Sequence, residues 1–457
     1  MTPADAQETT ATKRVYIKTH GCQMNMSDSE KVIGMLAAEG YRLTDEETEA
    51  DLLVVNTCSI REKAEDKLFS LLGVWKDRKK ANPDVQIAVM GCVAQQEKDR
   101  IRERVPLVDV VVGTHNYHEL PELLEEARIK GPITRIGNLK APIPDDLPTV
   151  REGKFHAWVP IIHGCSYFCT YCIVPYTRGP YQSRKPEAIE KEVRELVDEG
   201  FKEFTLLGQT VDRYGMELQG DEKTTLGGLL RRLSAVPGVE RIRFLTSHPL
   251  DMTEELVETV AALPNVMEYF HFPIQAGSDR VLAEMKRGYT VAEYLEKVAL
   301  IRKHIPDAVI SGDLIVGFPG ETEEDFQGTL EVVDRVEFDS NNTASYSVRQ
   351  WTPAGKRDDQ LGEEVKADRL QRLNEKVAEV AYRRNRRMVG TVQEVLVEGP
   401  SSKNPEVFQG RTRGNKICYF PGDASLEGQI VKVQVTEARP FTLRGEIVKS
   451  IVPLQMA

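Results

Sequence analysis

The sequence predicts an α/β protein of three domains: a doubly wound parallel sheet, a partial (β/α) barrel and a small all-β barrel. Three observations support this prediction. The chain has 457 residues, which is too long for one ordinary domain. Short apolar strands alternate with helical stretches over most of its length, as in βα units. Near the C-terminus only short strands punctuated by glycine and proline remain. We place the domains at residues 14–130, 151–380 and 381–450, with a proline-rich linker at 131–150.

Composition excludes several classes of protein. The chain is 40% apolar and 29% charged, as globular proteins are. No stretch approaches the roughly 20 apolar residues needed to cross a bilayer, and residues 1–13 form a polar tail without an apolar signal segment, which we expect to be disordered. Seven cysteines in such a chain argue for thiol or metal chemistry in a reducing compartment. We therefore expect a cytoplasmic monomer without membrane association.

The first domain is predicted from four apolar strands rich in β-branched residues, separated by helical segments. Such strands are buried on both faces, as in a parallel sheet covered by helices. We expect the first helix to open at Ser27, because Glu30 follows three residues later in capping-box spacing. The strands are expected at 15–19, 52–56, 86–90 and 108–112.

Three cysteines of this domain follow three of its strands. Cys22, Cys58 and Cys92 come after the first, second and third strand. The carboxyl ends of parallel strands meet at one edge, where open α/β sheets build their ligand sites. Ordinary buried cysteines are common and remain the alternative. Same-edge placement favours an iron–sulfur cluster that is open and faces another domain.

The second domain opens with a strand at 155–163 and a loop with three closely spaced cysteines. Cys165, Cys169 and Cys172 follow a CxxxCxxC pattern. A cubane 4Fe–4S cluster needs four soft ligands, so three cysteines leave one iron for a small molecule. A structural zinc site with His163 as fourth ligand is the alternative, although zinc sites favour CxxC pairs.

Further strands of the predicted barrel recur at intervals, with helices between them. We expect the strands at 203–208, 241–247, 269–275, 307–318 and 341–351, and the helices at 186–199, 253–262, 279–286, 290–304 and 322–336. Ligands of such barrels bind at the carboxyl ends of the strands. Glycines there let the backbone approach a nucleoside, and polar side chains bond to ribose and carboxylate groups, although each alone is more often a turn residue. The candidate ligand-binding residues are Gly208, Gln209, Ser247, Gln275, Ser278, Gly317, Pro319 and Gly320.

The C-terminal region is basic on an otherwise acidic chain. The net charge is −11, yet residues 381–450 hold 12 Lys/Arg against 7 Asp/Glu. A helix with an apolar face leads into five short strands, which predict a small barrel. Barrels of this size often bind RNA through a basic face, although a solvated charged face would look similar. The candidate RNA contacts are Arg178, Arg383, Arg384, Arg411, Arg413 and Lys416. Cys418 is apolar-flanked and is expected in the core.

Several motifs together resemble a known family along nearly the whole chain. The CxxxCxxC loop resembles that of the radical S-adenosylmethionine (SAM) superfamily. The motifs at 19–30, 56–67, 90–96, 163–184, 246–251 and 313–326 resemble those of the radical-SAM methylthiotransferases. Gly-Cys-Gln-Met-Asn at 21–25 is similar to the bacterial MiaB-type branch, and the C-terminal barrel looks like the TRAM RNA-binding domain. The chain departs from the branch pattern at His20, at Thr210 and Asp212, and at Gln350 and Trp351.

This resemblance implies a function. Cys165, Cys169 and Cys172 would hold the cluster at which SAM is reductively cleaved. Cys22, Cys58 and Cys92 would hold an auxiliary 4Fe–4S cluster that donates a methylthio group. The implied substrate is carbon 2 of N6-isopentenyladenosine beside the anticodon of tRNA, with an electron-donor protein and a sulfur source as further partners. The alternatives are threonylcarbamoyl-adenosine in tRNA, an aspartate of a ribosomal protein, or a non-catalytic iron–sulfur RNA-binding regulator.

Overall fold

The structure, a computed structural model, describes residues 13–59, 63–349 and 351–448. The chain divides into two compact units: Met1–Glu152 with Ile173–Pro180, and Gly153–Cys172 with Tyr181–Ala457. We call them unit 1 and unit 2. The stretch Ile173–Pro180 belongs to unit 1, although the sequence analysis placed it in the second domain. Residues 1–12 of the expected tail, residues 60–62 of the second motif, Gln350, and the last residues of the expected third domain lie outside the described residues.

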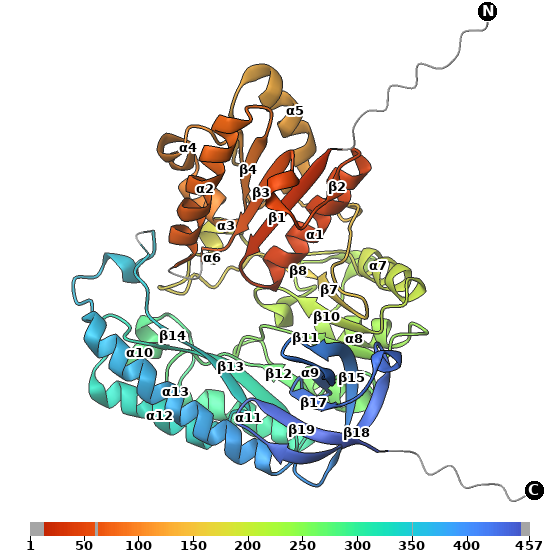
Figure 1. Ribbon diagram of the computed structural model, residues 1–457. Helices are drawn as coiled ribbons and strands as arrows, with labels where there is room; N and C mark the ends of the chain where they lie inside the picture. The colour runs from red at the N-terminus through yellow and green to blue at the C-terminus, as the bar shows by residue number, and fades with distance from the viewer. Residues whose placement is uncertain (1–12, 60–62, 350, 449–457) are drawn as a thin grey trace, which may run out of the picture. The chain divides into compact units, whose positions relative to one another are not determined.

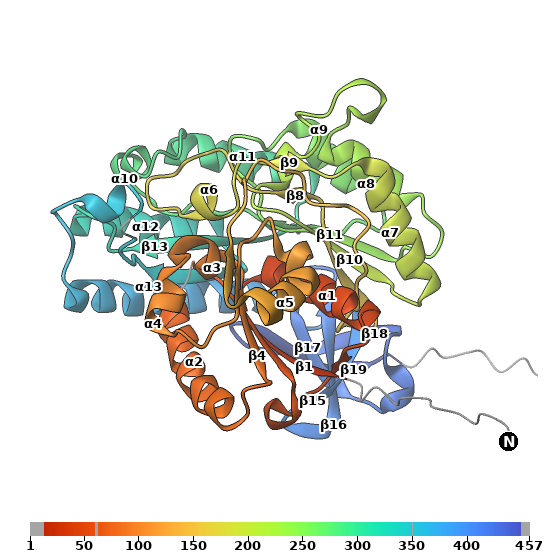
Figure 2. The same ribbon diagram turned by 90° about the horizontal axis from the view of Figure 1, so that it is seen from above.

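Unit 1 is built on one parallel sheet covered by helices on both faces. Its strands are β1 (Arg14–His20), β2 (Arg42–Leu43), β3 (Leu52–Thr57), β4 (Gln86–Met90), β5 (Val110–Val112) and β6 (Ile133–Arg135), in the order β2-β1-β3-β4-β5-β6. Its longer helices are α1 (Gln23–Ala38), α2 (Lys63–Ala81), α3 (Cys92–Glu97), α4 (Arg100–Arg104) and α5 (Leu120–Lys130). Helices α1 and α5 cover one face, and α2 and α4 cover the other (Figure 2). The predicted doubly wound sheet is confirmed.

The alternation along β3 explains why its first four residues are apolar. Leu52 and Val54 pack into the core beneath α1 and α5, whereas Leu53 and Val55 pack into the core beneath α2. Successive side chains of a strand point to opposite faces, so a stretch of strand with two covered faces is apolar at successive positions. The polar residues Asn56 and Thr57 come only at the carboxyl end of the strand, where Cys58 follows.

The start of α1 differs from the prediction. The helix begins at Gln23 with Cys22 as its N-cap residue, four positions before the expected start at Ser27. The backbone N–H groups of Asn25 and Met26 donate to the carbonyl oxygen of Cys22, which closes the first turn without a side-chain cap. Glu30 forms no capping box, because its carboxylate accepts hydrogen bonds from Arg151 instead.

Unit 2 carries six parallel strands that form an open, partial barrel. They are β7 (His156–Pro160), β10 (Glu203–Leu207), β11 (Arg241–Phe244), β12 (Tyr269–His271), β13 (Val309–Val316) and β14 (Ser340–Ser345). Sheets β11-β10-β7 and β12-β13-β14 meet through a bridge between Ile242 and Val266. The main helices around them are α7 (Pro186–Asp198), α8 (Leu226–Ser234), α9 (Glu254–Ala262), α11 (Val291–His304) and α12 (Glu323–Val336). Within the described ranges β7 and β14 do not pair, so the predicted partial barrel is confirmed.

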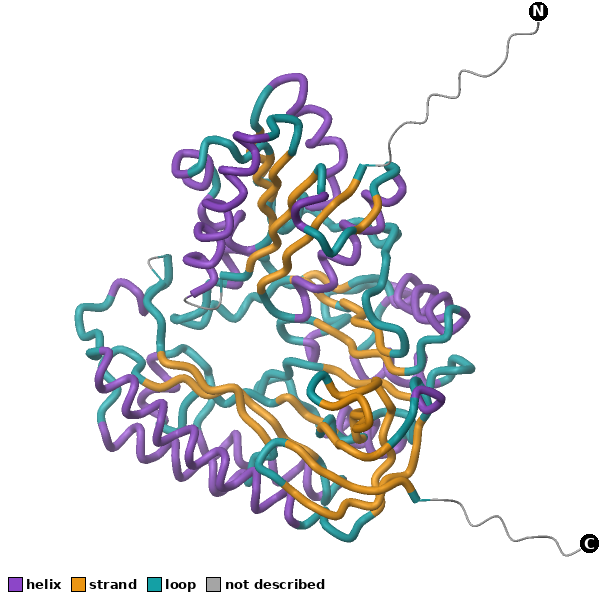
Figure 3. The backbone as a smooth tube through the Cα atoms, viewed as in Figure 1, coloured by secondary structure: helices purple, strands orange, loops and turns teal. Residues whose placement is uncertain are grey.

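A long helix leads from the partial barrel to the C-terminal barrel. Helix α13 (Glu363–Arg386) packs beside α12, and Figure 1 shows the two running side by side. Five strands then close into a barrel in the order β15-β16-β17-β19-β18 (labelled in part in Figure 1). Figure 3 draws all strands of the chain in orange. They are β15 (Val392–Ser401), β16 (Asn404–Thr412), β17 (Ile417–Pro421), β18 (Ile430–Ala438) and β19 (Thr442–Ile447). The predicted small barrel is confirmed, and Cys418 lies in its core as expected.

Two buried arginines fix this small barrel to the partial barrel within unit 2. Arg243 of β11 donates to the carbonyl oxygen of Thr412 at 2.6 Å and to that of Arg413. Arg241 donates to the carbonyl oxygen of Arg411 at 2.8 Å. Glu203 of β10 balances their charge, at 2.8 Å from Arg243 and 3.6 Å from Arg241. Glu203 and Arg241 are the first residues of β10 and β11. These two residues therefore lie at the opposite end of the strands from the carboxyl edge.

Candidate functional site

The structure brings Cys22, Cys58 and Cys92 together at the carboxyl edge of the sheet of unit 1. Cys22 lies between β1 and α1, Cys58 follows β3, and Cys92 is the first residue of α3. The strand order reverses at β1, because the chain continues to β2 on one side and to β3 on the other. Such a reversal opens a crevice between diverging loops. Gly21 is needed here, since a Cβ atom at this position would lie 2.9 Å from the Cβ atom of Cys58.

The three thiols interact directly. The Cys58 side chain is hydrogen-bonded to both Cys22 and Cys92, and this bonding is the largest cause that lowers the pKa of Cys22 to about 6 and that of Cys92 to about 7. The same two bonds, together with burial, raise the pKa of Cys58. Two of the three groups are therefore poised as thiolates, which are the form that binds iron.

The surroundings of these thiols fit an iron–sulfur cluster. Four buried polar atoms close to the cysteines in the chain have no hydrogen-bond partner in the described part of the protein: Ser27 Oγ, Thr57 Oγ1, Ser59 Oγ and Gln95 Oε1. A buried polar group without a partner costs about 1–3 kcal/mol, and a cluster on the neighbouring cysteines would supply partners for such groups. Hydroxyl groups can donate to the sulfides of a cluster. Cluster binding by the three cysteines nevertheless stays a prediction.

A buried ion pair lies beside this trio. Arg178 Nη2 is 2.8 Å from Asp28 Oδ2, and both side chains are at most 5% exposed. Arg178 was expected to contact RNA. The structure does not support this expectation, because its guanidinium is enclosed within unit 1 and faces Cys22 and Cys92, whose pKa values it lowers.

In unit 2, the CxxxCxxC loop follows the first strand of the partial barrel. The N–H group of Cys172 donates to the carbonyl oxygen of Cys169 at 3.0 Å, which turns the loop on itself. Arg287 Nη1 donates to Cys169 Sγ at 3.4 Å, and Thr210 Oγ1 lies 3.6 Å from Cys165 Sγ. The pKa of Cys165 is raised by burial. A thiol set with a buried cation beside it suits an anionic cluster better than a closed zinc site.

Aromatic and acidic side chains support this loop. The ring of Tyr167 stacks on His248 with centroids 3.8 Å apart, and the Tyr167 hydroxyl donates to Asp251. Burial lowers the pKa of His248 to about 2, so its imidazole is neutral. Its Nδ1 accepts a hydrogen bond from the N–H group of Leu250, which places the ring proton on Nε2. That buried Nε2–H has no partner among the described residues and can donate to a ligand.

Asp212 is the second unusual acid near this loop. Burial raises its pKa to about 7, although Ser247 Oγ and the N–H group of His248 both donate to its carboxylate. The carboxylate therefore fixes the backbone and side chain that follow β11. The sequence named Ser247 but gave no sign that Asp212 or Arg287 would be buried here.

The predicted SAM contacts all lie after the strands of the partial barrel, yet in different environments. Gln209 has a buried Oε1 without a partner in the described chain, and Gln275 is held at a φ of 81° by backbone bonds to β13. Gln209, Ser247 and Gln275 follow β10, β11 and β12, which are the next three strands of the partial barrel after β7. Gly208 packs against Ile162, since a Cβ atom there would approach its side chain to 2.3 Å.

The remaining predicted contacts serve turns and caps. Ser278 caps the helix at Asp279–Glu284 and donates to Asp325. Gly317 and Gly320 have positive φ values of 72° and 71° on either side of the buried Pro319. A ligand role for these four residues stays a prediction.

Most of the predicted RNA contacts are engaged within unit 2. Lys416 is buried and its Nζ lies 2.7 Å from Asp339. Arg413 pairs with Glu268 at 2.6 Å, and Arg384 pairs with Asp339. Arg411 is paired with Glu398 at the surface, and Arg383 with Asp334. The basic loop around Arg413 thus docks the small barrel on the partial barrel, which was not expected.

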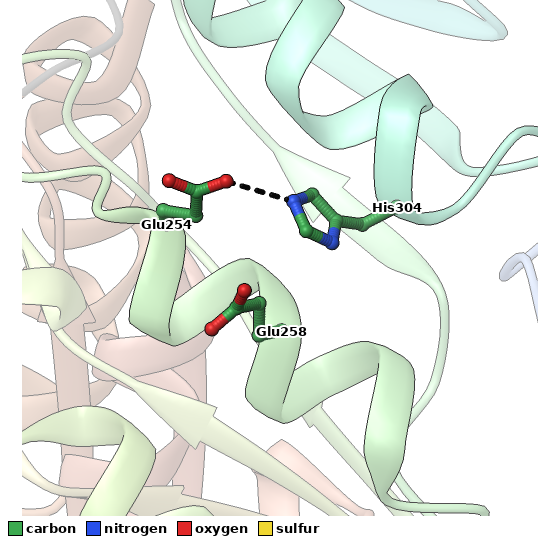
Figure 4. Close-up of side chains that lie close together, drawn as sticks. All are labelled: Glu254, Glu258 and His304. Carbon is green, nitrogen blue, oxygen red and sulfur yellow. Dashed lines mark hydrogen bonds and ion pairs between the residues drawn. The ribbon is translucent and has the colours of Figure 1, made fainter.

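A further group of ligand-type side chains lies on the helices outside the barrel. Figure 4 shows Glu254 and Glu258 on α9 facing His304 at the end of α11. Glu254 accepts a hydrogen bond from His304 Nε2 at 3.0 Å and pairs with Lys303, which lower its pKa. Because both glutamates are exposed and Glu254 is paired with His304 and Lys303, the group is explained as a surface ion-pair cluster.

In the ranges described by the structure, no helix combines the length and the apolar character required to traverse a lipid bilayer.

Family comparisons match three successive segments of the chain. "Uncharacterized protein family UPF0004" matches residues 14–113, "Radical SAM superfamily" matches 159–333, and "TRAM domain" matches 386–448.

Curated relatives match nearly the whole chain. The tRNA-2-methylthio-N(6)-dimethylallyladenosine synthase of Moorella thermoacetica is 48% identical over 96% of this chain and 99% of its own length. The protein of the same name from Desulforamulus reducens is 46% identical over 95% of this chain and 96% of its own length.

Solved structures show a related fold at low sequence identity. The radical S-adenosylmethionine methyltransferase TsrM from Kitasatospora setae has a TM-score of 0.55 and 14% identity, covering 75% of this chain and 77% of its own. The cobalamin-dependent S-adenosylmethionine radical enzyme OxsB has a TM-score of 0.51 and 13% identity, covering 78% of this chain and 56% of its own.

Proposed function

The chain belongs to the family of tRNA-2-methylthio-N(6)-dimethylallyladenosine synthases, and from this premise we propose that it methylthiolates carbon 2 of N6-isopentenyladenosine in tRNA by radical SAM chemistry. The observation that carries the proposal is the presence of two separate cysteine trios, one in each unit. Each trio supplies three of the four ligands that a cubane cluster takes. Each cluster would therefore keep one iron open, one for SAM and one for the sulfur group.

Cys165, Cys169 and Cys172 would hold the first cluster. When bound there, the cluster and SAM supply the one-electron chemistry that removes a hydrogen atom from an aromatic C–H bond, which no side-chain base could do. Arg287 donates to Cys169 and balances the negative charge of the ligands. The buried Nε2–H of His248 and the amide of Gln209 are placed to bind the polar groups of SAM.

Cys22, Cys58 and Cys92 would hold the second cluster. When bound there, it supplies the sulfur-bearing group that the substrate receives. The chain's own contribution is a set of thiols with lowered pKa values at Cys22 and Cys92, with buried hydroxyls close to them in the chain. These hydroxyls are available to the cluster sulfides.

The partners follow from this reaction. The substrate is tRNA, and its modified base must leave the anticodon-loop stack to reach the carboxyl edge of the barrel, as base-modifying enzymes require. The small C-terminal barrel contributes RNA binding through surfaces that its docking leaves free. An electron-donor protein and a sulfur source complete the reaction, and these partners fit a cytoplasmic enzyme that acts as a monomer.

Mass spectrometry of tRNA nucleosides tests the substrate. A deletion strain should lose 2-methylthio-N6-isopentenyladenosine and accumulate N6-isopentenyladenosine, and the intact gene should reverse both changes. Persistence of the methylthio nucleoside in the deletion strain would refute the assignment. Loss of a methylthio group from threonylcarbamoyl-adenosine or from a ribosomal protein would instead identify one of those substrates.

Cysteine variants test the division of labour. Cys165→Ala should abolish formation of 5′-deoxyadenosine and keep the auxiliary cluster. Cys58→Ala should keep SAM cleavage and lose methylthio transfer. Cys418→Ala is the matched control, because this buried thiol lies in the small barrel and should leave both activities unchanged. A Cys58→Ala protein that still modified tRNA would contradict the role proposed for Cys22, Cys58 and Cys92.

A further inference from the structure

Arg178 is supplied to the auxiliary trio by the segment that follows the CxxxCxxC loop. It comes six residues after Cys172, and the stretch Ile173–Pro180 is part of unit 1. Its short helix α6 (Val174–Thr177) packs against α3, whose first residue is Cys92. The hydroxyl of Thr114 donates to the carbonyl oxygen of Thr177 and ties the segment down. The segment that directly follows Cys172, the last cysteine of the CxxxCxxC loop, therefore places the guanidinium of Arg178 in the unit that holds the other three cysteines.

The burial of this cation requires an explanation. Arg178 is 4% exposed and pairs with Asp28 at 2.8 Å. A buried ion pair is often no more stabilising than apolar side chains of the same volume. Its retention at this place therefore points to a role of the charge itself, and the groups nearest to that charge include the thiols of Cys22 and Cys92.

The ion pair joins the elements that carry two of the thiols. Asp28 belongs to α1, whose N-cap residue is Cys22. Arg178 follows α6, which packs against α3, and α3 begins with Cys92. Because the two charges of the pair are opposite, Asp28 weakens the positive field that Arg178 exerts on the trio.

We propose that Arg178 is a positioning residue that raises the reduction potential of the cluster held by Cys22, Cys58 and Cys92, and that Asp28 limits this rise. The inference rests on the proposed function, since it assumes a cluster on this trio. Reduction adds one electron from an external donor to the cluster and changes no bond. A nearby fixed positive charge favours the more negative reduced form, and net charge is one of the quantities that set cluster potentials.

The test measures the potential of the auxiliary cluster alone. The full-length chain carries alanine in place of all three cysteines of the CxxxCxxC loop (Cys165→Ala, Cys169→Ala and Cys172→Ala). Only the auxiliary trio of Cys22, Cys58 and Cys92 can then hold a cluster. Iron and sulfide are quantified after anaerobic reconstitution, and the midpoint potential is measured by dithionite titration followed by electron paramagnetic resonance. Arg178→Gln, Arg178→Lys and Asp28→Asn are compared in this background. Arg42→Gln is the control, because Arg42 is an exposed arginine on β2 of the same unit.

The two kinds of variant should shift the potential in opposite directions. Arg178→Gln should make it more negative, Arg178→Lys should restore most of the difference, and Asp28→Asn should make it less negative. Arg42→Gln should leave it unchanged. A purely structural role predicts no such opposite shifts.

The possible failures are distinguishable. Equal potentials in all variants with full iron content would overturn the inference and leave the proposed function standing. Loss of the cluster in every Arg178 and Asp28 variant would show a structural role and also overturn it. Absence of iron and sulfide from the background protein itself would instead contradict the proposed function.

Discussion

Replacement of Arg243 by methionine should strongly destabilise unit 2. The Arg243 side chain is 2% exposed, and it donates to Glu203 at 2.8 Å and to the carbonyl oxygens of Thr412 and Arg413. Methionine fills similar space but leaves Glu203 with Arg241 at 3.6 Å as its remaining ion-pair partner. Burial raises the pKa of Glu203, but Arg243, together with His156 and Arg241, lowers it below its ordinary value, so the carboxylate is charged.

The magnitude follows from this geometry. Removal of one partner from a buried ion pair costs about 3–5 kcal/mol, because the other charge stays buried with less compensation. Arg241 stays 3.6 Å from Glu203, so we expect a loss at the lower end of this range. The matched control is Arg439→Met, since Arg439 is more than half exposed and pairs with Glu437 at the surface. A surface pair of this kind contributes about 0–1 kcal/mol.

Urea unfolding of the reconstituted protein measures the effect on the free energy of unfolding, and limited proteolysis reports release of the small barrel. The double variant Arg243→Met with Glu203→Gln should be less destabilised than the sum of the single variants, because each single variant already removes the direct bond between these two side chains. A loss below about 1 kcal/mol in Arg243→Met, comparable to a surface pair, would refute the claim that this arginine docks the small barrel.

Three further predictions concern Asp212 and Arg287, which lie near the CxxxCxxC loop, and Cys418 in the small barrel. The pKa of Asp212 is about 7, above its ordinary value of 3.8, so the folded state keeps a proton that the unfolded chain releases between these values. The wild type therefore loses stability as pH rises from about 4 to about 7, by about 4 kcal/mol at 1.36 kcal/mol per pKa unit; Asp212→Asn should lack this loss in unfolding measured from about pH 4 to about pH 8. Arg287→Gln removes the donor to Cys169 and should slow formation of 5′-deoxyadenosine about 10- to 100-fold, measured by chromatography at matched iron content; an unchanged rate would contradict the role of this donor. Burial raises the pKa of Cys418 to about 12, so this thiol should resist iodoacetamide at pH 8 in the folded protein, and rapid alkylation would show that the small barrel opens.

Local sequence patterns predicted the fold well where burial is uniform. The stretch 52–56, which opens with four apolar residues, predicted β3, and the alternation of these four side chains between two cores explains the pattern. The five short C-terminal strands close into a barrel as expected. The start of α1 was wrong, because the capping-box pattern at Ser27 could not show that Cys22 already closes the first turn.

The sequence predicted which cysteines would come together, but it did not predict which other side chains would surround them. Strand order alone brings Cys22, Cys58 and Cys92 to one edge, which a pattern of strands can predict. The role of an arginine depends on which distant residue it meets. Arg178 and Lys416 looked like surface cations in sequence, yet each is buried against an aspartate. No local pattern encodes these long-range pairs.

Anaerobic quantification of iron and acid-labile sulfide tests the central claim, that two trios each hold a cubane cluster. The reconstituted wild type should contain about eight irons and eight sulfides per chain, and a variant with either trio replaced by alanine should contain about four of each. A wild type that contains zinc and no sulfide would contradict the account. So would a wild type with about four irons that are lost when one trio is replaced and retained when the other trio is replaced.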